Sequence, residues 1–102
     1  MTKYNAKRAK IDGYTFDSQA EGRRYRALKL LERAGEISNL RVHPRFKLLD
    51  KTDTDRAVYY VADFAYDENG KRVVEDVKGV ETAVFRLKAN MFRRKYNNVK
   101  FV

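Results

Sequence analysis

The stretch YYVADFAYDENGKRVVEDVKG, residues 59–79, decides how the chain is predicted to fold. Asn69-Gly70 lies between two runs rich in aromatic and β-branched residues. This dipeptide suits a two-residue type I′ turn because both of its residues tolerate a positive φ. The pattern therefore predicts a β-hairpin in which Asp63 lies directly opposite Asp76.

The predicted register places two carboxylates side by side. Because side chains alternate between the faces of a strand, Lys78 is expected on the face of Asp63 and Asp76, while Glu75 points the other way. Like charges opposite each other, about 5 Å apart, destabilise a sheet, so this pair needs a compensating cation. Lys78 supplies part of it, and hard oxygen ligands suit Mg²⁺ or Mn²⁺ for the rest. Two alternatives stay open: these residues are simply solvated on an exposed face, or a longer turn aligns Asp63 with Glu75.

The composition limits the class of protein. The 102 residues suffice for one domain with a modest core, and 23 Lys and Arg against 14 Asp and Glu give a net charge of +9. This charge points to a polyanionic partner, a nucleic acid first. The charge is spread over several predicted elements, which argues against a membrane-surface helix. With no cysteine and no apolar run long enough for a membrane span, we expect a soluble, cytoplasmic protein without disulfides.

The N-terminal residues differ in character from the rest. Residues 1–10 hold four basic residues, no acidic one and no hydrophobic periodicity. We predict a basic flexible arm over residues 1–10 and a single domain over residues 11–102. Such an arm can lie along phosphates, and a merely solubilising tail is the alternative.

A helix is predicted over residues 18–34, after a short strand over residues 13–16. Its apolar stripe, extended one turn back, reaches Glu21, so a carboxylate is expected on the buried face. Alternatively, Glu21 closes a capping box by bonding to the Ser18 amide. The spacing leaves both interpretations open. The stripe itself consists of Tyr25, Leu28 and Leu31.

Residues 37–49 alternate between apolar and polar, which predicts a strand with one core face and one basic face. Pro44 removes a hydrogen-bond donor and indicates an edge strand or a bulge. His43, the only histidine, falls on the polar face, where contact with solvent or phosphate is expected. The core face has Leu40, Val42, Phe46 and Leu48, and the basic face has Arg41, His43, Arg45 and Lys47.

A second helix is predicted over residues 82–96, followed by a short strand over residues 98–102. Its apolar side has Val84, Phe85, Met91 and Phe92, and its other flank carries Arg86, Lys88, Arg93, Arg94 and Lys95. A basic flank is usually solvated surface, but with a nucleic acid as the expected partner it indicates binding to the phosphate backbone. We therefore expect an α+β fold, with a mixed sheet and a central hairpin flanked by two helices.

The ordered motifs resemble known nucleases. Asp63 followed by Asp76-Val77-Lys78 is similar to the D…(D/E)-x-K signature of the PD-(D/E)XK nuclease superfamily. Segments 11–18, 60–66 and 74–79, together with Glu21 and Arg24-Tyr25, resemble a family of small phage proteins of unknown function, grouped with the junction-resolving, endonuclease I-like phage enzymes. This resemblance covers nearly the whole chain and implies a nuclease-like fold and a Mg²⁺- or Mn²⁺-dependent DNA endonuclease.

The resemblance also implies roles for residues. Asp63, Asp76 and Glu21 are expected to hold the metal, and Lys78 completes the catalytic set by orienting the water or stabilising the pentavalent state. The competing hypothesis is a non-catalytic basic nucleic-acid-binding module. The sequence leaves open whether the DNA is branched, flapped, nicked or plain duplex, and whether the protein is a homodimer. The residues expected to contact DNA are Arg23, Arg24, Arg41, Arg45, Lys47, Lys88, Arg93 and Arg94.

Overall fold

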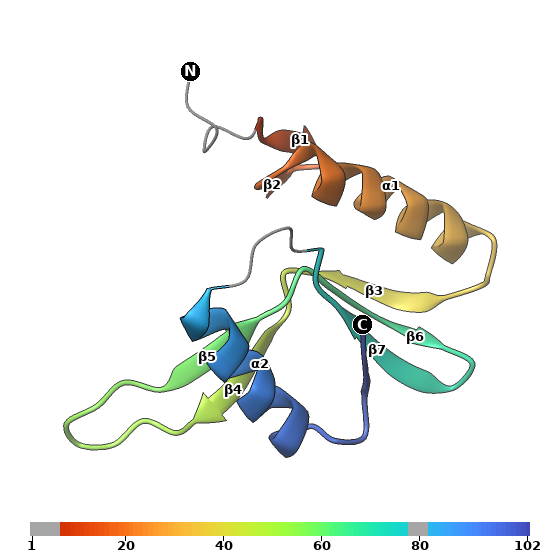
Figure 1. Cartoon of the computed structure of the whole chain (residues 1–102). Coiled ribbons are helices and arrows are strands. Elements are labelled where there is room, and N and C mark those ends of the chain that lie inside the picture. The colour runs from red at the N-terminus through yellow and green to blue at the C-terminus, as the bar shows by residue number, and fades with distance from the viewer. Residues whose placement is uncertain (1–6, 78–81) are drawn as a thin grey trace.

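The computed structural model describes residues 7–77 and 82–102, which form an α+β fold (Figure 1). In chain order the elements are β1 (Ala9–Ile11), β2 (Tyr14–Phe16), α1 (Gln19–Arg33), β3 (Ser38–Val42), β4 (Arg45–Leu49), β5 (Val58–Val61), β6 (Phe64–Glu68), β7 (Lys71–Glu75), α2 (Ala83–Lys95) and β8 (Lys100–Phe101). The predicted fold class, with a central hairpin between two helices, is confirmed.

The hairpin of β6 and β7 has the predicted register. Phe64 pairs with Glu75, and Glu68 pairs with Lys71. Asn69 and Gly70 have φ values of 53° and 77°, as a type I′ turn requires. The alternative register, with Asp63 opposite Glu75, is therefore wrong.

The central sheet has the strand order β3-β6-β7-β8. The first three strands are antiparallel and β8 runs parallel to β7, so the sheet is mixed. β4 and β5 form a separate antiparallel pair. The C-terminal strand is shorter than the predicted 98–102, although the Val102 N–H still donates to the Val74 carbonyl at 2.9 Å.

A sharp bend divides two segments that the sequence predicts as continuous strands. Residues 37–49 split into β3 and β4, and the first hairpin strand splits into β5 and β6. Two hydrogen bonds carry the pairing through the bend, from the His43 N–H to the Asp63 carbonyl at 2.9 Å and from the Ala62 N–H to the Pro44 carbonyl at 3.1 Å. Pro44 has no N–H to donate, and His43 adopts a φ of 53°. Both features explain why the strands turn here.

Both helices lie where the sequence predicts them. The Ser18 hydroxyl caps α1 by accepting from the Glu21 N–H at 3.2 Å, and the Thr82 hydroxyl caps α2 by accepting from the Phe85 N–H at 3.0 Å. Within the described residues, no helix is long and apolar enough to cross a membrane.

Two clusters of buried side chains hold the layers together, one on each face of the central sheet. Phe64, Tyr66 and Val73 pack with Tyr25 and Leu28 of α1, whereas Ala65 and Val74 belong to the cluster that includes Phe92 of α2. In Figure 1, α1 lies over β3, β6 and β7, and α2 packs beside β4 and β5. The alternation along the strands therefore assigns neighbouring hairpin residues to different helices.

Three expectations about individual residues are wrong. Ala9 and Lys10, assigned to the flexible arm, belong to β1, which pairs with β2. Leu31 is 36% exposed and Val84 is 63% exposed, so each lies at the margin of its helix's apolar stripe rather than within the core. The rest of the predicted arm, residues 1–6, lies outside the described residues.

Candidate functional site

Asp63 and Asp76 come together at the point where β5 bends away from β6. The Asp63 N–H donates to the Asp76 Oδ1 at 3.0 Å, and the Val77 N–H donates to the Asp63 Oδ2 at 2.5 Å. Each carboxylate is thus held by a backbone N–H of the other strand. Their predicted cross-strand proximity is confirmed.

Tyr60 is a third member of this site, which the sequence analysis did not identify. Its hydroxyl donates to the Asp76 Oδ2, and its side chain belongs to the cluster on the α2 side of the sheet. Burial, followed by this hydrogen bond, raises the pKa of Tyr60 well above its ordinary value. Tyr60 therefore acts as a neutral donor that fixes the orientation of Asp76.

Glu21 is buried on α1, as the apolar stripe predicts, with 5% of its surface exposed. One half of the capping box is present, and it uses the backbone N–H of Glu21 rather than the carboxylate. Within residues 7–77 and 82–102, no group of three or more His, Cys, Asp or Glu side chains is arranged to hold a metal. Glu21 therefore does not join Asp63 and Asp76 in one three-carboxylate cluster there.

The two aspartates still fit a magnesium ion by their donor chemistry. Mg²⁺ in proteins usually keeps several waters and is bound by one or two carboxylates together with substrate phosphates. A carboxylate oxygen that accepts one hydrogen bond still has a second lone pair to offer. Lys78, the fourth residue predicted for this site, lies outside the described residues.

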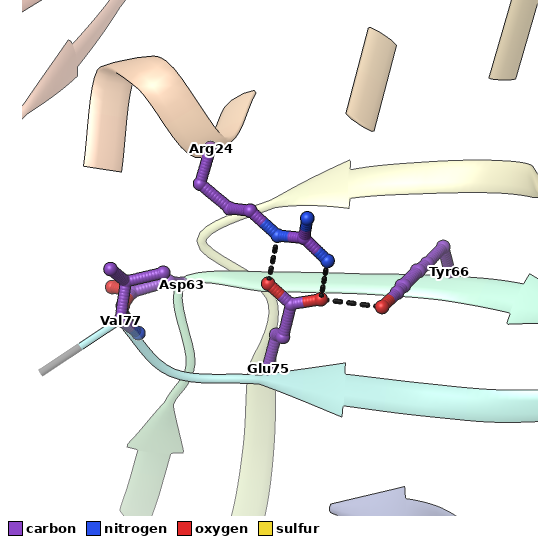
Figure 2. Close-up of polar contacts among 5 residues, drawn as sticks. All are labelled: Arg24, Asp63, Tyr66, Glu75 and Val77. Carbon is purple, nitrogen blue, oxygen red and sulfur yellow. Dashed lines mark hydrogen bonds and ion pairs between the residues drawn. The ribbon is translucent and has the colours of Figure 1, made fainter. Parts of the chain in front are cut away.

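A partly buried ion pair joins α1 to the hairpin (Figure 2). Arg24 of α1 donates to both oxygens of Glu75, from Nε to Oε1 and from Nη2 to Oε2, each at 2.7 Å. The Tyr66 hydroxyl donates to the same carboxylate. Glu75 therefore faces away from Asp63, as predicted, but it anchors α1 to the central sheet.

The protonation of this cluster follows from its partners. Burial by itself raises the pKa of Glu75, but the hydrogen bonds from Arg24 and Tyr66 and the charge of Arg24 outweigh burial, so the pKa lies below its ordinary value. Burial and the bond to Glu75 raise the pKa of Tyr66 to about 12. The cluster is therefore a charged pair with a neutral phenol at neutral pH.

The eight residues expected to contact DNA differ in their surroundings. Arg24 is committed to Glu75, which leaves it poorly placed for phosphate contacts. Lys47 lies 3.6 Å from Asp50, and the Arg45 guanidinium lies 4.1 Å from the centre of the Tyr59 ring. Lys88 is half-buried, while Arg23, Arg41, Arg45, Lys47, Arg93 and Arg94 are exposed.

His43 is half-buried, with its ring 5.6 Å from that of Phe16. Its predicted position on a polar strand face is therefore only partly correct, because its ring lies beside the buried Phe16 of β2.

Comparison with known proteins identifies a family but not a function. Residues 1–102 match a family described as "Protein of unknown function (DUF1064)". No curated protein and no solved structure matches the chain.

Proposed function

The chain belongs to the DUF1064 family, and we propose that it is a metal-dependent DNA endonuclease that hydrolyses phosphodiester bonds. The observation that carries this proposal is the Asp63–Asp76 pair, in which backbone N–H groups fix both carboxylates at the bend. Like charges on opposite strands destabilise a sheet, and a cation bound by both carboxylates would relieve this repulsion.

Asp63 and Asp76 are the principal residues that would hold Mg²⁺ or Mn²⁺. The Val77 carbonyl and Glu21 would bind the ion directly or through its coordinated waters. A bound divalent ion would neutralise the charge on the phosphate oxygens and would lower the pKa of a bound water. Tyr60 keeps the Asp76 carboxylate oriented by donating to Oδ2. Lys78, two residues after Asp76, is assigned the role of orienting the water or stabilising the pentavalent state.

The Arg24–Glu75 ion pair supports the site from the other face. It connects α1 to the residue before Asp76, and Glu21 lies one turn before Arg24 on the same helix. Residues three apart on a helix project from neighbouring positions. Fixing Arg24 on β7 therefore also fixes where the helix presents Glu21.

The second candidate function is a non-catalytic nucleic-acid-binding module. What favours it is that Glu21 does not complete a three-carboxylate cluster with the two aspartates in the described part of the chain. Exposed cations on β3, β4 and α2 would then bind phosphates, and the aspartates would be structural.

Incubation of the purified chain with supercoiled plasmid and with branched DNA separates the two functions. The endonuclease nicks or linearises DNA with Mg²⁺ or Mn²⁺ and leaves it intact in EDTA. Retarded migration of DNA without cleavage in either metal would instead support the binding module.

A further inference from the structure

A basic hollow lies beside the first turns of α1. It has a volume of about 280 Å³, and the residues that line it include four cations and no acidic residue. We define the basic hollow by these cations, which are Arg8, Lys10, Arg23 and Arg26.

The hollow exists because β1 packs directly on α1. A Cβ atom on Gly22 would lie 2.8 Å from the Ala9 Cβ and 3.2 Å from the Ile11 Cδ1, so only glycine allows this approach. The Gln19 Nε2 also donates to the Arg8 carbonyl at 3.0 Å. This packing therefore places Arg8, just before β1, and Lys10 of β1 beside Arg23 and Arg26 of α1.

The hollow faces away from the Arg24–Glu75 ion pair. Gln19, Gly22, Arg23 and Arg26 recur at the spacing of a single helix face. At roughly 100° per residue, Arg26 projects about 200° from Arg24. The hollow therefore lies on a face of α1 that points away from Glu75, the residue before Asp76.

The four cations are placed to bind an anion from solution rather than a carboxylate of the protein. All four are exposed, and among the described residues none of them forms an ion pair with an acidic side chain. Like charges three residues apart on a helix, such as Arg23 and Arg26, destabilise it. A bound phosphate removes this repulsion, and the guanidinium fork matches phosphate oxygens.

We propose that the basic hollow binds backbone phosphates of a nucleic acid, as a second contact separate from the Asp63–Asp76 pair. The choice of a nucleic acid as the partner rests on the proposed function. The contact is to the sugar-phosphate backbone and carries no base specificity, because the cations reach phosphates without an element that enters a groove.

Fluorescence anisotropy with a short labelled DNA duplex in EDTA tests this site without cleavage. We compare Arg26→Glu with Arg33→Glu, because both residues are exposed on α1, the charge change is equal and Arg33 lies outside the hollow. Arg26→Glu should weaken binding about tenfold and lower the slope of log affinity against log salt by about 1. Arg33→Glu should weaken it less than about twofold, and Arg23→Glu should behave like Arg26→Glu.

Equal affinities for Arg26→Glu and Arg33→Glu, with both variants melting as cooperatively as the wild type, would overturn the site. The plasmid assay keeps this failure distinct from that of the endonuclease. If the wild type never cleaves DNA but Arg26→Glu weakens binding, the endonuclease proposal is contradicted and the phosphate-binding hollow is supported. If the wild type cleaves DNA but Arg26→Glu leaves binding unchanged, the phosphate-binding hollow is contradicted and the endonuclease proposal is supported.

Discussion

Arg23 and Arg24 are neighbours in the sequence with opposite surroundings. Arg23 is exposed beside the basic hollow, whereas Arg24 donates two hydrogen bonds to Glu75, whose side chain is only 8% exposed. No property of either residue alone distinguishes them. The difference comes from the helix period, which turns Arg24 towards β7 and Arg23 towards β1.

Arg24→Ala should lower the free energy of unfolding by about 2 to 3 kcal/mol, because it leaves the buried Glu75 carboxylate without its cation. The expected loss is below that for a fully buried pair, since the Arg24 side chain is 38% exposed. Arg23→Ala is the matched control and should change stability by less than about 0.5 kcal/mol. Equal urea midpoints for the two variants would contradict the anchoring role of Glu75.

The same cluster predicts an acid dependence of stability. The folded-state pKa of Glu75 lies below its ordinary value of 4.5, so the unfolded chain binds the proton first as the pH falls. The stabilisation by Glu75 is therefore complete above the ordinary pKa and is lost as the pH falls through the folded-state pKa. We compare the free energies of unfolding of the wild type and Glu75→Gln from pH 7 downwards. The wild type should be the more stable protein at pH 7, and the difference should shrink below pH 4.5. A constant difference would show that the Glu75 charge is not the stabilising feature.

At the level of elements, the bend at residues 43–44 and 62–63 creates the candidate site. The chain leaves β5, which pairs with β4, and enters β6 of the central sheet here, so that Asp63 at the bend lies beside Asp76 just after the end of β7. The sequence predicts the hairpin, its turn and its register, because these depend on a local dipeptide and on alternation. It does not predict the bend, since the alternation continues through residues 37–49 and only Pro44 indicates a disruption.

The sequence indicates the partners of the acidic residues only in part. Tyr66 lies diagonally from Glu75 on the same hairpin face, which strand alternation could have indicated. The contact of Tyr60 with Asp76 could not be inferred, because Tyr60 pairs with Phe46 in another sheet. The charge of Arg24 predicts DNA binding, and only the structure shows that its partner is Glu75 of β7.

Gly22→Ala tests how α1 and β1 fit together. Helix propensity alone predicts a gain of about 1 kcal/mol from this substitution. The new Cβ would lie 2.8 Å from the Ala9 Cβ, and overpacking of this kind costs about 1 to 3 kcal/mol. We therefore expect a lower melting temperature than that of the wild type. A higher melting temperature would show that β1 does not pack closely on Gly22.

For the whole molecule, the net charge of +9 should govern nucleic-acid binding. If about six phosphates are contacted, affinity should fall about a thousandfold between about 50 and 200 mM salt. Arg41→Glu, Arg45→Glu and Arg94→Glu should each weaken binding to unrelated duplex sequences by similar factors, because phosphate contacts carry no base readout. Electrophoretic titrations over a salt series measure both effects. A flat salt response would exclude these cations as the binding surface.

The central claim is that the Asp63–Asp76 pair hydrolyses phosphodiesters with a divalent metal. Plasmid nicking in Mg²⁺ by the wild type, Asp76→Asn and Asp67→Asn tests it most directly, since both aspartates belong to the same hairpin segment but Asp67 bonds to Arg72 and Asn39 away from the pair. We predict a loss of about a hundredfold or more in Asp76→Asn, near wild-type nicking in Asp67→Asn, and cooperative melting of all three proteins. Nicking by Asp76→Asn at the wild-type rate, or no metal-dependent nicking by a folded wild type, would contradict the claim.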